Sequence, residues 1–394
     1  MRLKTFTSIF VFAIAGLVAG MIGCERAKQV IKPATQMEGL SEDISIGVVT
    51  SRTGVFGPTE SDPGASIMEN GFRLALEEIN QSQLLGEATL KLVVEDDMST
   101  IEGAIASFNK VIRQDKVSAI VGIWTSQIAQ FVFPIAQENQ VVVVSPVTSA
   151  SGLAGIGEFI FCVNLTTDIL IPNGVAVTQA KLGYTRVATI TDEDDLFSQS
   201  SESMLKQTFD GKNIEVSAAE TISSGDTDFS VQLTRIKGSD PDAVFISAQP
   251  IEAAGIIIQG RQLGLPFDVP FIVGLNLSID DIQRIGDAAE GVITFTSWST
   301  TVDTPGNQSF VQHYKAKYGT EPSIWAALAY TDLHILTQAI ANAQSMRPKA
   351  IATALADIRD FDTILGKFSF DSNGDAIYDP VVLIVKNGKL RVFE

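Results

Sequence analysis

The chain has 394 residues, 45% of them apolar, so it is long enough to fold into two lobes that each bury a core. Its formal net charge is -18, which argues against binding to nucleic acid or to anionic lipid surfaces. It has two cysteines and two histidines, and His313 and His334 have no partner at the spacing of zinc ligands. We therefore expect no metal and no cofactor.

The first 23 residues are predicted to be a signal peptide. Arg2 and Lys4 precede an apolar segment over residues 9–22, as in the basic and apolar regions of an export signal. The uncharged stretch 5–24 has the length of a membrane span, so an uncleaved anchor is the alternative interpretation.

The signal ends in a pattern that resembles a bacterial lipobox, with Gly23 before Cys24. Met21 stands where leucine is usual. We expect a lipid on Cys24 and a flexible linker over residues 24–43. An ordinary signal peptide with an incidental cysteine is the other interpretation. The second cysteine, Cys162, lies in an apolar run and is expected to be a buried, unreactive thiol.

From residue 44 onward, short apolar runs alternate with helical patterns. Strands are predicted at 44–50, 90–95, 119–121, 141–144, 186–191, 214–219, 243–247, 271–273 and 292–296. Helices are predicted at 66–81, 101–113, 127–137, 169–182, 196–209, 229–237, 251–263, 279–285, 308–318, 325–343 and 348–357. This order predicts an α/β fold of the doubly wound type, in which helices cover both faces of parallel sheets.

Two further segments have a specific interpretation. The loop 51–65 is long for a compact domain, which is typical of a functional loop. Residues 367–370 and 381–386 are predicted to form a hairpin-like pair around the turn Asp371-Ser372-Asn373-Gly374-Asp375. That turn begins like a calcium loop but lacks the later glycine and glutamate, so we reject a calcium site.

Ser126 and Ser149 follow neighbouring predicted strands, and ligands of parallel sheets bind beyond the carboxyl ends of strands. Ser126 also stands where a helix begins, close to unpaired N–H groups that suit a carboxylate. The competing interpretation is that Ser126 is only a helix cap and Ser149 only a turn residue.

Several stretches resemble the leucine/isoleucine/valine-binding protein group of ABC-importer periplasmic binding proteins. They are ISIGVVTSRTG, NGFRLALEEIN, LKLVVEDD, VSAIVG, VVVVSPVTSAS, DFSVQLTRIKGSDPDAVFI, GRQLGL, GDAAEGVI and KFSFDSNGD. The resemblance covers roughly residues 44–390. It implies a type I periplasmic-binding-protein fold, with two doubly wound lobes joined by three crossing strands and a ligand cleft between them.

The resemblance also implies where the lobes divide. Lobe 1 would comprise residues 44–163 and 299–379, and lobe 2 residues 164–298 and 380–394. The ligand would be captured by closure of the two lobes.

In the family, residues matching Ser126 and Ser149 hold the α-carboxylate and α-ammonium of the ligand, with Thr148 beside them. The residue matching Val147 offers its carbonyl to the ammonium. Trp124 is expected to flank an apolar ligand side chain, and packing in the core is the alternative.

The other half of the family's pocket departs from the pattern. Phe197 and Gln249 stand where family members often have tyrosine, and Asn276 stands near the position of a glutamate that pairs with the ammonium. Asp168 or Asp195 can supply the missing negative charge. Without it, the ligand would be an amide, a hydroxy acid or another small carboxylate, because an unpaired buried ammonium is costly.

The resemblance implies a lipid-anchored solute-binding protein of the cell envelope, in the periplasm or on the outer face of the cytoplasmic membrane. It would bind a small amino acid, branched-chain or otherwise apolar, or a related carboxylate or amide, and deliver it to the permease subunits of an ABC importer. A ligand sensor of the same fold that signals to a membrane receptor is the alternative. A third interpretation, an amidase-type enzyme, would have only Ser126, Ser149 and the distant histidines to use.

Overall fold

The computed structural model describes Leu40 and residues 43–58, 65–274 and 277–394. The predicted signal peptide, the lipidation site Cys24, most of the predicted linker and Asn276 lie outside the described residues. None of the helices in the described ranges is long and apolar enough to cross a membrane.

The first sheet is parallel and has the strand order β2-β1-β3-β4-β5. Its strands are β1 (Ile44–Thr50), β2 (Leu90–Asp96), β3 (Ala119–Gly122), β4 (Val142–Ser145) and β5 (Ile160–Cys162). The intervening helices are α1 (Ser66–Ser82), α2 (Ile101–Arg113) and α3 (Ser126–Glu138). The doubly wound pattern predicted for this region is therefore confirmed.

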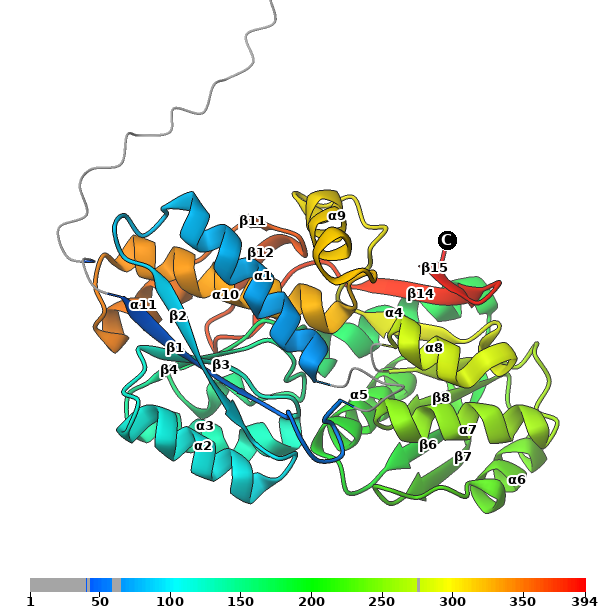
Figure 1. Cartoon of the computed structure of the whole chain (residues 1–394). Helices are drawn as coiled ribbons and strands as arrows, with labels where there is room; N and C mark the ends of the chain where they lie inside the picture. The colour runs from blue at the N-terminus through cyan, green and yellow to red at the C-terminus, as the bar shows by residue number, and fades with distance from the viewer. Residues whose placement is uncertain (1–39, 41–42, 59–64, 275–276) are drawn as a thin grey trace, which may run out of the picture. The chain divides into compact units, whose positions relative to one another are not determined.

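Successive side chains of each central strand enter different cores, because side chains alternate across a strand. Val48 packs with α1 and α10 (Ile324–Ala343), whereas its neighbour Val49 packs with α2 and α3. Figure 1 shows these two helix layers on opposite faces of the sheet. Burial on both faces explains why the strands read as continuous apolar runs in the sequence.

The second sheet has the order β15-β14-β10-β9-β8-β6-β7. Its parallel strands are β6 (Arg186–Asp192), β7 (Glu215–Ile222), β8 (Ala243–Ser247), β9 (Phe271–Val273) and β10 (Ile293–Thr296). Its helices are α4 (Thr167–Leu182), α5 (Leu196–Lys212), α6 (Ser230–Gly238), α7 (Pro250–Gln262) and α8 (Ile279–Ile285). The antiparallel strands β14 (Val381–Lys386) and β15 (Lys389–Val392) complete one edge.

The predicted hairpin of residues 367–370 and 381–386 is wrong. Strand β12 (Gly366–Phe370) pairs with β11 (Phe361–Thr363) and β13 (Ala376–Ile377), whereas β14 pairs with β10 and β15. The turn at 371–375 joins β12 to β13. Asp371 stabilises this turn by accepting hydrogen bonds from the N–H groups of Asn373 and Asp375 at 2.8 and 2.9 Å.

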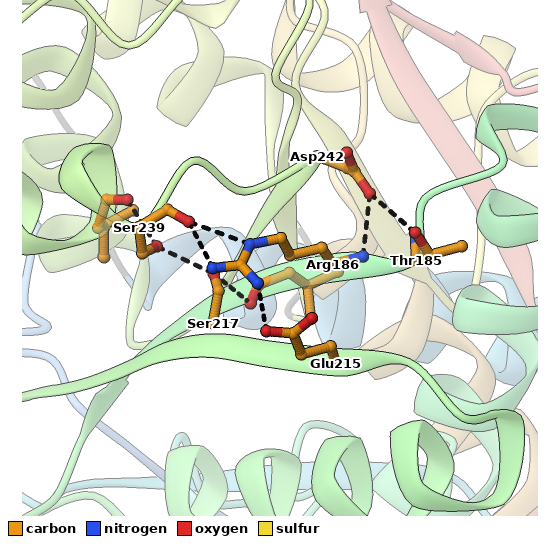
Figure 2. Close-up of polar contacts among 8 residues, drawn as sticks. Thr185, Arg186, Glu215, Ser217, Ser239 and Asp242 are labelled. Carbon is orange, nitrogen blue, oxygen red and sulfur yellow. Dashed lines mark hydrogen bonds and ion pairs between the residues drawn. The ribbon is translucent and has the colours of Figure 1, made fainter.

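Arg186 fixes the amino ends of three strands of the second sheet (Figure 2). Its Nε and Nη2 donate to the carbonyl of Ser239 at 3.1 and 3.0 Å, and its Nη1 pairs with Glu215 on β7. Asp242, just before β8, accepts from the N–H groups of Thr185 and Arg186, both at 2.9 Å. These contacts set the register at the edge of the sheet opposite to the carboxyl ends.

The chain passes between the sheets after β5, after β10 and before β14. Polar side chains tie the three passages together. Asn164 donates to the carbonyl of Val147 at 3.1 Å, Ser297 donates to Asn164, and the Tyr378 hydroxyl donates to the carbonyl of Val163 at 3.2 Å. After the second passage, α9 (Asn307–Tyr318), α10 and α11 (Pro348–Ala356) follow. The residue at which one lobe ends and the other begins stays a prediction.

Candidate functional site

A pocket of about 330 Å³ lies at the carboxyl ends of strands from both sheets. Its walls come from the segments that follow β1, β3, β4, β5, β6, β8 and β9, and from the starts of α1 and α10. The lining residues are Val55, Phe56, Gly57, Ile67, Trp124, Thr125, Ser126, Val147, Ser149, Asn164, Phe197, Gln249, Pro250, Ile251, Ser278, Asp280, Asp281, Arg284 and Trp325. This is the position that doubly wound sheets offer to a ligand.

The amino end of α3 opens onto this pocket. The cap of α3 is Thr125, whose Oγ1 accepts from the N–H of Ile128 at 3.2 Å. The interpretation of Ser126 as the helix cap is therefore wrong. The Oγ of Ser126 accepts from the N–H groups of Ser149 and Ala150 at 3.2 and 3.1 Å, and its own hydrogen can be donated to a ligand.

The loop after β4 is held from the opposite side. The Ser149 hydroxyl donates to the carbonyl of Leu165, and Asn164 donates to the carbonyl of Val147. The Val147 carbonyl keeps a second lone pair, and the Ser149 oxygen, which only donates in this bond, keeps its acceptor capacity, so both can still accept from a ligand. The loop is thus organised in the ligand-free protein, which lowers the entropy cost of binding.

Trp124 reaches the pocket through a strained turn. Gly122 and Ile123 both have left-handed backbone conformations, with φ of 107° and 68°. A Cβ on Gly122 would lie 2.2 Å from the carbonyl oxygen of Val49, so only glycine fits there. A β-branched residue such as Ile123 rarely adopts positive φ, and such strain costs about 1–3 kcal/mol. The turn buries Ile123 completely and leaves Trp124 partly exposed on the pocket wall.

The loop after β1 is anchored by the residues after β2. Asp96 accepts from the N–H groups of Arg52 and Thr53 at 2.9 and 3.2 Å and from the Thr53 hydroxyl at 2.6 Å. The Oγ of Ser99 donates to the carbonyl of Thr53 at 2.7 Å and accepts from the N–H of Phe56 at 3.1 Å. These bonds position Phe56 in the pocket wall. The sequence predicts a functional loop here, but it does not identify Phe56 as a pocket residue.

The wall contributed by the second sheet carries charge. Asp280, Asp281 and Arg284 on α8 line the pocket. Asp281 forms a capping box with Ser278, whose N–H donates to Asp281 at 2.8 Å, and its other oxygen lies 3.1 Å from Arg284. The three charged residues sum to one net negative charge. The resemblance predicts an acidic position near Asn276, and the acidic residues that line the pocket among the described residues are Asp280 and Asp281.

Gln249 and Phe197 lie on the same side of the pocket. Behind them, Asp195 caps α5 by accepting from the N–H and Oγ of Ser198 at 2.9 and 2.8 Å. Burial raises the pKa of the Asp195 carboxyl, while the hydrogen bonds from Ser198 and Gln249 act in the opposite direction. Asp195 is therefore part of the structure behind the pocket but does not line it.

Two predicted contact residues are not brought to this pocket. Thr148 is buried behind it, where its hydroxyl lies 3.0 Å from Ser145 Oγ and 3.2 Å from Cys162 Sγ. Asp168 lines a different depression, together with Asp371 and Asp375. Neither residue lines the pocket that holds Ser126.

The chain's two histidines, His313 and His334, both lie near Glu78. His313 Nδ1 lies 2.9 Å and His334 Nε2 lies 4.0 Å from carboxylate oxygens of Glu78 on α1. Neither lines the pocket that holds Ser126. Within the described ranges, no group of three or more His, Cys, Asp and Glu residues is placed to hold a metal ion.

Residues 43–389 match the family model described as periplasmic binding protein. The chain is 28% identical to the Leu/Ile/Val-binding protein BraC3 of Rhizobium johnstonii, over 84% of this chain and 89% of that protein. Two solved structures share the fold along most of their length. A leucine-binding protein LivK from Thermotoga maritima has a TM-score of 0.82 and 30% identity, covering 89% of this chain and 98% of the other.

The second structure is the substrate-binding protein LivJ of a branched-chain amino acid transporter from Streptococcus pneumoniae, in complex with isoleucine. It has a TM-score of 0.81 and 26% identity over 89% of this chain and 98% of that chain. The likeness spans both sheets and the segments that form the pocket.

Proposed function

Since the chain belongs to the periplasmic binding protein family, in its leucine/isoleucine/valine-binding group, we propose that it is the solute-binding lipoprotein of an ABC importer. It captures a small amino acid of the branched-chain or another apolar type, or a related small carboxylate or amide, and delivers it to the permease. The family works outside the cytoplasm, and its members named above are binding proteins rather than enzymes.

The polarity of the pocket is the observation that carries the proposal. The Ser126 hydroxyl and the amino end of α3 favour a carboxylate on one side. On the other side, Asp280, Asp281 and Arg284 together carry one net negative charge, which favours an ammonium group. Apolar and aromatic side chains lie between these ends. A small zwitterion with an apolar side chain matches this arrangement.

We propose that the ligand is held by Ser126, Ser149, Val147, Trp124, Phe197 and Gln249, with Asp280 supplying the negative charge that had been sought at Asn276. We expect the two lobes to close on the ligand, because these residues come from segments of both sheets. A ligand between the lobes makes more contacts when they shut, which shifts the population toward the closed form.

The lipid anchor at Cys24 is part of the same proposal. It is supported by the basic start, the apolar run and the Gly23-Cys24 junction in the sequence. Intact mass of protein from the membrane fraction should correspond to residues 24–394 plus a diacylglyceryl group. A soluble chain that is cleaved elsewhere would contradict the anchor and leave the binding function untouched.

A thermal-shift screen over amino acids, their amides and small carboxylic acids tests the binding function. A true ligand at about 100 times its dissociation constant should add ~2.7 kcal/mol to the free energy of unfolding. Small-angle scattering with the same ligand should show a smaller radius of gyration. If no compound of these classes stabilises the protein, the proposed function is wrong.

A further inference from the structure

Three aromatic rings lie next to one another in the pocket. Phe56, Trp124 and Trp325 come from the loop after β1, the turn after β3 and the first turn of α10. The ring centroids of Phe56 and Trp124 are 6.5 Å apart, and those of Trp124 and Trp325 are 5.6 Å apart. Both separations fall within the range in which aromatic rings attract one another. The rings therefore form one continuous surface, here called the ring wall.

Local backbone structure holds two rings of the ring wall at the pocket. Ile123 adopts a strained backbone conformation immediately before Trp124, and the Ser99 hydroxyl accepts from the N–H of Phe56. The aromatic residues that build the neighbouring core, such as Phe108 and Phe133, are fully buried, whereas Phe56 and Trp124 remain partly exposed. Aromatic rings that stay partly exposed on the wall of a pocket are available for contact with a ligand.

The ring wall lies beside the site proposed for the carboxylate. Trp124 is two residues before Ser126, and both line the same pocket. A ligand whose carboxylate meets the Ser126 hydroxyl therefore presents its next group to the indole of Trp124. A planar ring that makes offset or edge-to-face contacts with these rings is attracted more strongly than its buried area alone provides, whereas a branched aliphatic chain makes only packing contacts with them.

We propose that the ligand carries an aromatic ring next to its carboxylate, and that Trp124 and Trp325 select it. Aromatic amino acids and arene-bearing carboxylic acids share this chemistry. The inference rests on the binding function proposed above and narrows its ligand class. It makes the ring, rather than a branched aliphatic chain, the preferred side group.

Four compounds test it by calorimetric titration of the protein: phenylalanine, 3-phenylpropanoate, leucine and 4-methylpentanoate. Phenylalanine and leucine form one pair, a ring against a branched chain, and both carry the ammonium group. The second pair, 3-phenylpropanoate and 4-methylpentanoate, makes the same comparison without the ammonium group. We expect the ring compound of each pair to bind roughly 2- to 13-fold more tightly than its aliphatic counterpart. Comparison of phenylalanine with 3-phenylpropanoate tells whether the ring belongs to an amino acid or to a simple acid.

Variants of the ring-wall residues show which side chains produce the preference for a ring-bearing ligand. Trp124→Leu and Trp325→Leu keep an apolar side chain but remove a ring, so the ratio of ring to aliphatic affinity should fall toward one. Trp124→Phe keeps a ring and should retain most of the ratio. Trp298→Phe is the matched control, because Trp298 is buried against Phe310 and does not line the pocket. The ratio does not depend on how much stability a variant loses.

The outcomes are distinguishable. If none of the four compounds binds, the proposed function fails for this class of ligand. If leucine or 4-methylpentanoate binds at least as tightly as its ring counterpart, the ring inference fails and the binding function stands. If the preference exists but survives in both leucine variants, the ring wall does not produce it.

Discussion

The Oγ of Ser126 accepts a hydrogen bond from the backbone N–H of Ser149 at 3.2 Å, which joins the first turn of α3 to the loop after β4. The two serines predicted as independent ligand contacts are thus parts of one structure. A change at Ser126 should disturb both the free protein and the bound ligand. Stability and affinity must therefore be measured together.

Ser126→Ala should lower the free energy of unfolding by roughly 1–3 kcal/mol, because the N–H groups of Ser149 and Ala150 lose their acceptor. It should also weaken binding of a carboxylate ligand by about 10- to 150-fold, because a hydrogen bond to a charged group is lost. Denaturant unfolding and calorimetric titration measure the two effects.

Thr100→Ala is the matched control for Ser126→Ala. Thr100 caps α2 through an Oγ1 that accepts from the N–H of Gly103 at 3.0 Å, and it does not line the pocket. It should cost about 1 kcal/mol of stability and leave affinity unchanged. Unchanged affinity in Ser126→Ala as well would remove Ser126 from the ligand site.

Asp280→Asn should weaken binding of an amino acid by about 10-fold or more, because the anion that we propose for the ammonium is replaced by a neutral amide of similar shape. The same ligand without its ammonium group should bind to the Asp280→Asn variant at least as tightly as to the parent protein. Asp287→Asn, an exposed change outside the pocket on the segment after α8, is the control. Equal losses for ligands with and without the ammonium would contradict the charge argument.

Ser99→Ala should loosen the loop that carries Phe56, because the Ser99 hydroxyl bonds to both Thr53 and Phe56. Hydrogen exchange should become faster at the amides of residues 52–57, and the affinity for the ligand should fall several-fold because ordering the loop then costs entropy. Exchange rates that match the parent protein would show that Asp96 alone holds the loop.

Asp332 should make the protein less stable at neutral pH than in mild acid. The residue is fully buried on α10, neither carboxylate oxygen has a hydrogen-bond partner among the described residues, and burial raises its pKa well above the ordinary value. The folded state then binds this proton more tightly than the unfolded state. Its contribution to stability therefore falls as pH rises from about 4 through the raised pKa, and stays low above it.

Asp332→Leu should raise the free energy of unfolding at pH 7 by roughly 1–3 kcal/mol, because an unsatisfied buried polar group is removed. Asp332→Asn should flatten the pH dependence between about pH 4 and pH 7. Urea unfolding at several pH values measures both, with the exposed Asp362→Asn as control. A parent protein whose stability does not change over this interval would contradict the assignment.

The sequence predicts the alternation of strands and helices well, because most strands are buried on both faces and helices such as α1 and α2 have clear apolar periodicity. It fails at the C-terminal hairpin, where β12 and β14 are close in sequence but join different sheets. Short-range turn signals say that the chain reverses at 371–375, but they do not say which strand pairs with which.

For the site, the sequence identifies residues directly at strand ends, such as Ser126 and Ser149. It does not identify Phe56 or Trp325, whose positions depend on how distant segments pack. It also places Thr148 in the pocket because its neighbours belong there, although side chains of adjacent loop residues point in different directions. The local sequence pattern determines whether a residue lies in a strand, a helix or a loop. Tertiary packing determines in which direction its side chain points.

The helix α10 has a consequence for how the protein is made. The face of the first sheet that holds Val48 packs against α1 and α10, but α10 begins only at Ile324, long after β5 ends at Cys162. At about 5–20 residues per second, synthesis of residues 163–323 keeps that apolar face incompletely covered for on the order of 10–30 s. A chain that begins to fold at this stage exposes apolar surface, which is where chaperones bind and where aggregation starts.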